Sequence, residues 1–210
     1  ADLISPEQIN ELKNDYPNVR IGQWFLDPLN KRGPDFERNR DRILNKINSV
    51  DATFLTTSPS ALNFVPKDKC FYIPNPSDKS FETLNNFHKS CNVDVFFALS
   101  HGVHRGVLKS GKTDDRVNFV NKLINLTSNA KFDIYGVNNI QPIWADHYFK
   151  TIANAKMGLN LSRGNAIKYY SSDRITQIVG NGLVCLIDEK TQYRDFFNDK
   201  EMVFYKNIND

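Results

Sequence analysis

Hydrophobic residues along the chain follow two spacings, one typical of helices and one typical of buried strands. Apolar side chains three or four positions apart predict helices over residues 6–14, 36–49, 116–126 and 144–155. Short apolar runs bounded by turn residues predict strands over residues 19–26, 52–56, 70–73, 94–99, 132–135, 158–161, 183–187 and 202–205. Because helices and strands alternate, we expect an α/β protein with parallel sheets and right-handed crossovers.

One stretch in the C-terminal part of the chain combines a helix, a glycine turn and a buried strand. Ser172 or Asp173 is placed to cap a helix whose apolar stripe falls within residues 175–179, and Gly180 and Gly182 predict its end at a left-handed turn. The apolar run that follows has the length of a central parallel strand covered on both faces. Such an arrangement presents polar groups at the carboxyl edge of a sheet, where α/β proteins bind ligands.

Two segments carry cations suited to binding an anion. Arg174 stands in the first turn of the predicted helix, where a cation opposes the helix dipole unless an anion lies nearby. Arg174 therefore binds a phosphate group or forms a surface salt bridge, and both interpretations stay open. The loop over residues 100–113 is basic, contains glycine and follows a predicted strand, so it is suited to wrap phosphate oxygens. The alternative is a solvated surface loop.

Residues 106–113 also satisfy the P-loop pattern of NTPases. Three features argue against that interpretation. Six residues separate the pattern from Leu99, bulky side chains occupy positions 107–108, and Asp114 and Asp115 place two carboxylates at the helix turn that is meant to hold an anion. A P-loop NTPase is kept as an alternative function.

Composition limits the class of protein without identifying it. The 210 residues are 40% hydrophobic and 12% aromatic, which is enough to form the cores of one or two domains. With 27 basic and 24 acidic residues, the net charge of +3 is too balanced to indicate nucleic-acid binding. Cys70, Cys91 and Cys185 lack metal-type spacing and favour reduced thiols in a cytoplasmic protein. The mild positive charge permits peripheral membrane association, but no basic amphipathic helix stands out.

Three stretches, in the same order along the chain, resemble the group 1 glycosyltransferases, especially their spore-maturation-protein-like branch. Residues 71–78 are similar to the Ile-Pro-Asn linker between the two domains of these enzymes, and residues 148–160 to the helix and strand before the donor-binding motif. Ser172, Arg174 and Gln177, followed by the glycine turn, resemble the donor-binding motif itself. One position departs from the family, because Gln177 stands where a glutamate receives the ribose hydroxyls of the donor.

The resemblance implies the type-B glycosyltransferase fold, which consists of two Rossmann-like units with parallel sheets. Residues 1–74 would be the later part of an N-terminal acceptor domain, residues 75–90 a linker, and residues 91–210 a C-terminal nucleotide-sugar-binding domain that lacks its final helix. Because the chain begins without Met and stops soon after a predicted strand, we expect a fragment in which the first unit is incomplete.

The resemblance also implies roles for individual residues. The diphosphate of the donor is expected at Arg105, Lys109, Ser172 and Arg174. The ribose and base are expected at Tyr135, Gly136, Val137 and Gln177, and the sugar at Asn160, Arg163 and Asn165. Neither a catalytic residue nor a metal ligand is assigned. The aromatic residues Trp24, Phe25, Trp144 and Tyr148 are interpreted as core side chains in preference to sugar platforms.

The implied reaction is a retaining, metal-independent, hexosyltransferase-like transfer, of the kind used in polysaccharide biosynthesis. The nucleotide-sugar donor is the substrate, no separate cofactor is expected, and the acceptor is a saccharide, a lipid or a protein that the sequence does not identify. No Asp-x-Asp motif occurs, so nothing indicates the magnesium site of the other main glycosyltransferase fold. Gln177 leaves a second alternative open, a non-catalytic remnant that binds a nucleotide sugar.

Overall fold

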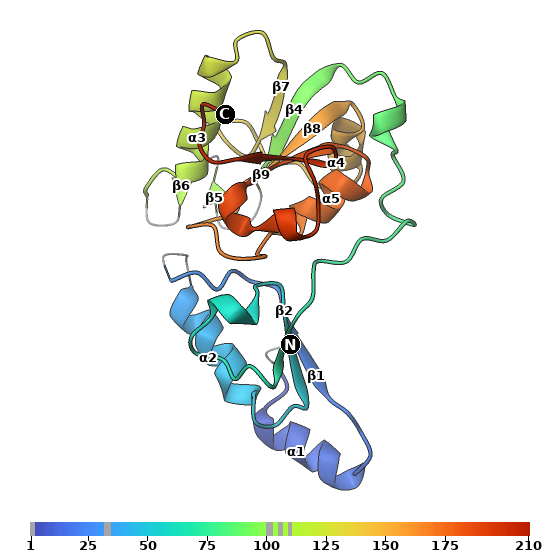
Figure 1. Cartoon of the computed structure of the whole chain (residues 1–210), viewed down its shortest axis with the longest axis vertical. Coiled ribbons are helices and arrows are strands. Elements are labelled where there is room, and N and C mark those ends of the chain that lie inside the picture. Colours follow the sequence, from blue (N-terminus) through green and yellow to red (C-terminus); the bar gives the residue numbers. More distant parts are fainter. Residues whose placement is uncertain (1–2, 32–34, 100–102, 105–106, 109–110) are drawn as a thin grey trace. The chain divides into compact units, whose positions relative to one another are not determined.

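The chain forms two compact units, each built around a parallel sheet (Figure 1). The computed structural model describes residues 3–31, 35–99, 103–104, 107–108 and 111–210. The first unit consists of Ala1–Asn75 and Gly164–Ser172, and the second of Pro76–Arg163 and Asp173–Asp210. The predicted fold class, α/β with two parallel sheets of which the first is smaller, is confirmed.

The first unit has three parallel strands in the order β1-β2-β3. Its elements are α1 (Pro6–Asp15), β1 (Gly22–Phe25), α2 (Phe36–Lys46), β2 (Ala52–Leu55), the 3-10 turn η1 (Pro59–Ala61) and β3 (Cys70–Tyr72). Helix α1 begins where the sequence predicts, because the Ser5 hydroxyl accepts the Gln8 N–H while the Gln8 side chain accepts the Ser5 N–H.

The core of the first unit lies between α2 and one face of its sheet. Ile43 of α2 and Leu55 of β2 are fully buried there. Ile167, far away in the sequence, packs against the same cluster. The segment that contains it is also held by its backbone, since the Ser58 N–H donates to the Lys168 carbonyl. This packing explains why Gly164–Ser172 belongs to the first unit although its sequence neighbours belong to the second.

The motif that resembles an interdomain linker contributes to the same attachment. The side-chain amide of Asn75 donates a 2.9 Å hydrogen bond to the Ser171 carbonyl. The rings of Tyr72 and Tyr169 lie 5.0 Å apart, centroid to centroid. The asparagine of this motif therefore has a structural role within the first unit.

The second unit has five parallel strands in the order β10-β9-β8-β4-β7. Its strands are β4 (Val93–Ala98), β7 (Phe132–Tyr135), β8 (Ala155–Asn160), β9 (Val184–Asp188) and β10 (Met202–Tyr205), with a short antiparallel pair, β5 (Val103–His104) and β6 (Val107–Leu108). Its helices are α3 (Asp115–Leu126), α4 (Ala145–Ile152) and α5 (Arg174–Gly180), with 3-10 turns η2 (Asn86–His88), η3 (Glu189–Thr191) and η4 (Tyr193–Asp195).

Helices cover both faces of this sheet, with α3 on one face and α4 and α5 on the other (Figure 1). The side chains of β4 alternate accordingly. Val95 and Phe97 enter the cluster with α3, whereas Phe96 and Ala98 enter the cluster with α4 and α5. A strand that is buried on both sides needs a continuous apolar sequence, which is the pattern that predicted it.

The order of the strands creates a topological switch point between β4 and β8. The chain passes from β4 to β7 on one side, and then crosses to β8 on the other side of β4. The connections that leave the carboxyl ends of β4 and β8 therefore run to opposite faces of the sheet. In open α/β sheets the crevice formed at such a point is where ligands bind.

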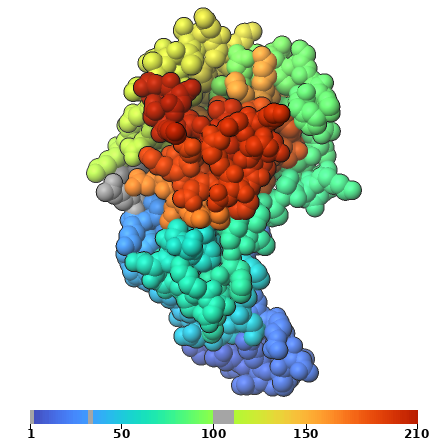
Figure 2. All heavy atoms as spheres, viewed as in Figure 1, coloured from blue at the N-terminus to red at the C-terminus, as the bar shows by residue number. Residues whose placement is uncertain are grey.

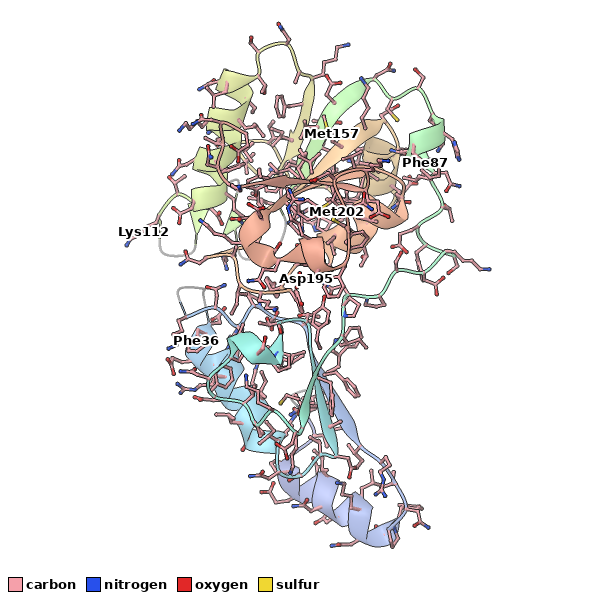
Figure 3. All side chains as sticks on the ribbon, in the orientation of Figure 1. Phe36, Phe87, Lys112, Met157, Asp195 and Met202 are labelled. Carbon is pink, nitrogen blue, oxygen red and sulfur yellow. The ribbon has the colours of Figure 1, made fainter. Side chains whose placement is uncertain are left out.

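Helix α5 packs unusually close to β8. Met157 of β8, labelled in Figure 3, packs against the α3 cluster, and the next residue, Gly158, faces α5. A Cβ atom at Gly158 would lie 2.5 to 2.9 Å from three side-chain atoms of the fully buried Ile178. Since real Cβ contacts are longer, this approach of helix and strand requires glycine at position 158.

The turn after α5 is anchored by a buried asparagine. Gly182 has a φ of 78°, which confirms the predicted left-handed turn, whereas Gly180 is the last helical residue. Asn181 is fully buried, and its side chain accepts the Leu84 N–H and donates to the Gln177 carbonyl. Residues 174–205, orange to red in Figure 2, form much of the surface on this face of the unit.

The segment that precedes β4 packs on the second unit. Asn86 is buried, and its amide group donates 2.8 Å hydrogen bonds to the carbonyls of Ile152 and Ala155. Its N–H donates to the carbonyl of Asn181. The adjacent Phe87, labelled in Figure 3, is exposed and touches the glycine turn. From Pro76 onward, the stretch predicted as a linker is therefore part of this unit by its contacts.

Replacing Gly158 with alanine should destabilise the protein. The added methyl group would overlap Ile178, so we expect the free energy of unfolding to fall by about 1–3 kcal/mol in urea titrations. In the double variant Gly158→Ala/Ile178→Ala the overlap is absent. The double variant should therefore lose less free energy of unfolding than the two single variants together, by at least about 1 kcal/mol. Additive costs would show that the close approach at Gly158 is unimportant.

Candidate functional site

Arg174 lies at the carboxyl end of β8, next to the switch point. Its Nη1 donates a 3.1 Å hydrogen bond to the carbonyl of Leu161, which directly follows β8. Its guanidinium carbon lies 5.3 Å from the ring centroid of Phe97 in β4. These contacts attach one cation to the ends of β8 and β4, the two strands at the switch point. A guanidinium group presents five N–H donors in a planar fork, which is the geometry that binds anionic oxygens.

A buried carboxylate holds two further guanidinium groups at the same edge. Asp114 is the N-cap of α3 and is only 2% exposed. It accepts hydrogen bonds from the backbone N–H of Arg116 at 2.9 Å, and from its Nε and Nη2 at 2.9 and 2.8 Å. The Nε of Arg163 lies 3.9 Å from the same carboxylate. Arg163 follows β8 by three residues, so Asp114 links α3 to the end of that strand.

The electrostatics of this cluster keep Asp114 ionised. Burial by itself would raise the pKa of Asp114, but the hydrogen bonds and charge of Arg116, together with the charge of Arg163, outweigh it and lower the pKa. With Arg174, three guanidinium groups lie at an edge that holds one buried carboxylate, while Asp115 and Asp173 at this edge are exposed. The arrangement is suited to receive an anionic ligand.

The predicted ribose and base residues follow β7, one strand away. Gly136 has a φ of 78°, and a Cβ atom there would lie 2.2 Å from the Leu99 carbonyl oxygen, so only glycine fits. Val137 is fully buried in the α3 cluster, which leaves its backbone as the part able to meet a ligand. The Tyr135 ring lies 6.0 Å from that of His147 and so packs toward α4. Their role in binding a base stays a prediction.

The other predicted residues fall in three places. Asn160 is the last residue of β8 and is buried, and Gln177 is half-buried one turn after Arg174 on α5. Asn165 and Ser172 belong to the segment of the first unit. Arg105 and Lys109, which the sequence assigns to the diphosphate, lie outside the described residues. Arg163 and Arg174 are therefore the predicted cations that the structure brings to one edge.

The described backbone does not favour a P-loop. Residues Val107–Leu108, inside the pattern, pair in antiparallel fashion with Val103–His104 instead of leading directly into a helix. The N-terminus of α3 is already capped by the carboxylate of Asp114, which occupies the position that a P-loop reserves for phosphate.

Sequence reasoning overlooked two features of this edge. The sequence suggested only that the charge of Asp114 would repel phosphate. In the structure, Asp114 accepts three hydrogen bonds from Arg116. The signal was an acidic residue two positions before the predicted helix, with an arginine as the first residue of that helix. Sequence reasoning also interpreted Trp144 and Trp24 as core residues. That interpretation was wrong, because Trp144 is 62% exposed and Trp24 43% exposed.

The described residues offer no metal centre beside these cations. In the described part of the chain, no group of three His, Cys, Asp or Glu side chains is arranged to hold a metal ion. An open cavity of about 430 Å³ lies in the first unit, where it is lined by Lys31, Phe36, Glu37, Arg40, Asn63 and Phe64. Arg40 in that cavity is paired with Glu37 and Asp41. Metal independence stays a prediction.

Comparison with known proteins supports a glycosyltransferase. Residues 116–210 match a family model described as "Glycosyl transferase-like". The matched stretch is a little under half of the chain, runs from α3 to β10, and contains Arg163, Arg174 and Gln177. No curated protein matches the chain. The resemblance to glycosyltransferases is thus supported for the second unit, whereas the spore-maturation-protein-like branch stays a prediction. Among the described residues, none of the helices has the length and apolar content of a membrane span.

The variant Asp114→Asn should be less stable and less sensitive to acid. Asparagine still caps α3, but Arg116 loses its buried counter-charge, so we expect a loss of about 3 kcal/mol at pH 7 in urea unfolding. The pKa of Asp114 is lower in the folded protein than the value of about 3.9 expected after unfolding. Its stabilising contribution is therefore present above about pH 4 and is lost as the pH falls through the folded pKa.

The matched control is Asp115→Asn, which removes an exposed carboxylate from the same turn of α3. We expect that variant to change stability by less than about 1 kcal/mol and to retain the acid dependence of the parent protein. Equal losses in the two variants would contradict a special role for Asp114.

Proposed function

We propose that the protein is a nucleotide-sugar-dependent glycosyltransferase whose second unit binds the donor at the carboxyl edge of its sheet. The observation that carries this proposal is the gathering of Arg163 and Arg174 where β8 ends beside β4. The match of residues 116–210 to a glycosyl transferase-like family supports it independently. Together they favour a diphosphate over other anions, because a nucleotide-sugar donor carries that group at its centre.

The chemistry of glycosyl transfer accounts for the cations. The bond between the sugar and the diphosphate breaks through an oxocarbenium-like transition state, and negative charge grows on the leaving oxygen. Fixed guanidinium groups that are already oriented stabilise this charge without reorganising. Arg174 is oriented by the Leu161 carbonyl, and Asp114 stands beside Arg163. Because fixed cations can neutralise the leaving diphosphate, we propose that the transfer is metal-independent. The resemblance to the group 1 glycosyltransferases favours a retaining reaction.

The remaining residues take finer roles in the same proposal. Arg105 and Lys109 add cations to the diphosphate site, with Ser172 as a hydroxyl donor. Asn160 and Asn165 contact the sugar, and Arg163 contacts both the sugar and the diphosphate to which the sugar is attached. Gln177 contacts the ribose, and the backbone after β7 meets the base. The first unit supplies the acceptor side, and the acceptor is a saccharide, a lipid or a protein.

The central test is binding of nucleoside diphosphates in the absence of magnesium, measured by calorimetry and by thermal shift. We expect Arg174→Ala and Arg163→Ala each to weaken binding roughly 10- to 100-fold, because each removes charge-assisted hydrogen bonds to the diphosphate. Arg174→Lys should recover part of the loss, since lysine retains the charge but not the planar fork of donors.

Lys156→Ala is the matched control for this test. Lys156 is also a cation, but it lies near the amino end of β8, at the opposite edge of the sheet from Arg163 and Arg174. There it pairs with Asp94. Its removal should leave the affinity unchanged. If Lys156→Ala weakens binding as much as Arg174→Ala, the diphosphate is attracted by overall charge and the proposed site is wrong. Binding that requires magnesium and is abolished by Lys112→Ala would favour the P-loop NTPase instead.

The substitution Gln177→Glu tests the ribose contact and the alternative of a non-catalytic remnant. A carboxylate accepts hydrogen bonds from two ribose hydroxyls, so we expect affinity for a nucleoside diphosphate to rise roughly fivefold. Affinity for the 2′,3′-dideoxy analogue should not rise. An equal change for both ligands would place Gln177 away from the ribose. If the Gln177→Glu variant turns over a nucleotide sugar and the parent protein does not, the present chain is a non-catalytic remnant.

A further inference from the structure

Trp144 is an exposed aromatic residue at the carboxyl edge of the second unit. It ends the connection from β7 to α4 and is the N-cap residue of α4. Its side chain is 62% exposed, although tryptophan is one of the residues that gain most from burial. Ile140 in the same connection is also exposed. The loop therefore presents an apolar surface to solvent at the edge where parallel α/β sheets bind ligands.

The local structure around Trp144 is unfavourable for stability in two further ways. Tryptophan makes no capping hydrogen bond to α4, where serine, threonine, aspartate or asparagine would satisfy an N–H group. The next residue, Ala145, has a φ of 49°, a left-handed conformation that is strained for a residue with a Cβ atom. An exposed indole, an uncapped helix and a strained backbone at one place are each unfavourable for stability. Such features occur together most often at functional sites.

Helix α4 begins close to the cation at the start of α5. Tyr148, one turn after Trp144, donates its N–H to the Trp144 carbonyl at 3.3 Å. Burial raises the pKa of Tyr148 to about 12, and the nearby charge of Arg174 opposes that rise. Residues of both helices also share one core cluster, including Ile143 before α4 and Ile175 in α5. Trp144 thus stands at the same edge as Arg174, on the same face of the sheet.

We propose that Trp144 is the platform on which the nucleobase of the donor stacks. This inference rests on the proposed function, because it needs a diphosphate held at Arg163 and Arg174. Once the diphosphate is bound, the nucleobase is the planar, largely apolar group of a nucleotide sugar that still needs a binding surface. The base must extend from the diphosphate over a neighbouring strand end. The β7–α4 connection lies there and offers an exposed indole ring, with the backbone of Gly136 and Val137 at its start.

Tryptophan fluorescence provides a direct test, because the chain contains two Trp residues. In the variant Trp24→Phe, Trp144 is the sole indole. We expect UDP, GDP or ADP to quench its emission with saturation, because a stacked base alters the surroundings of the ring. Inorganic pyrophosphate should bind to the cations, as measured by calorimetry, without changing the emission. Quenching by pyrophosphate equal to that by the nucleotides would overturn the stacking assignment.

The variant Trp144→Ser separates ligand binding from folding. Loss of the stacked ring should weaken binding of the nucleoside diphosphate about tenfold or more, whereas affinity for pyrophosphate should not change. Serine is a good N-cap, so the melting temperature of the free protein should rise by about 2–4 °C. Trp144→Phe should retain most of the affinity. A core role for Trp144 would instead lower the melting temperature and leave the affinity unchanged.

The outcomes distinguish this inference from the proposed function. Suppose that binding of nucleoside diphosphates depends on Arg174 but that Trp144→Ser does not lower their affinity. The donor site is then supported and the proposed role of Trp144 is overturned. If Trp144→Ser weakens a sugar 1-phosphate but not a nucleoside diphosphate, the ring contacts the sugar and the base assignment is overturned. If neither nucleoside diphosphates nor pyrophosphate bind to the parent protein, the proposed function itself fails.

Discussion

The close packing of α5 on β8 is the constraint on which the candidate site depends. Gly158 leaves no room for a side chain, so the fully buried Ile178 rests directly on the strand. This distance determines how α5 lies on the sheet, and it places Arg174, the first residue of the helix, within reach of the Leu161 carbonyl and the Phe97 ring. A side chain at position 158 would move the helix away and the cation with it. The position of the Arg174 guanidinium group thus depends on the absence of a side chain at Gly158.

Charge at the carboxyl edge is arranged by a second buried group, Asp114. A carboxylate that is almost fully buried is stable only when it is paired, and Arg116 provides three hydrogen bonds to it. The same carboxylate stands close to Arg163 from the end of β8. The buried and half-buried charges named at this edge are therefore three guanidinium groups and one carboxylate, and the buried carboxylate has a partner. Such an arrangement holds cations ready for an anion without the cost of burying them unpaired.

Stability and the proposed contact with the donor make opposite demands at the β7–α4 connection. Gly136 satisfies a backbone requirement, because it accepts a left-handed conformation against the Leu99 carbonyl. Ala145 adopts a left-handed conformation without that freedom, and Trp144 leaves α4 without a side-chain cap. Both residues would be poor choices if folding were the only requirement. The second unit tolerates them because its core lies beneath, in clusters on both faces of the sheet.

The sequence by itself determined the two-sheet α/β class and the kind and order of the main helices and strands, but not the short β5–β6 pair, which falls in a segment predicted as a loop. Those features depend on local spacing, as at Ser5, at Gly182 and in the apolar run of β9. It also pointed to Arg174, because a cation at a helix start is a local anomaly. Only the tertiary structure decided that Asp114 meets Arg163, that Gly164–Ser172 packs in the first unit, and that Trp144 is exposed while Val137 is buried. These outcomes depend on contacts between residues far apart in the chain, and burial and pairing cannot be read from periodicity because both are set by the neighbours that folding brings together.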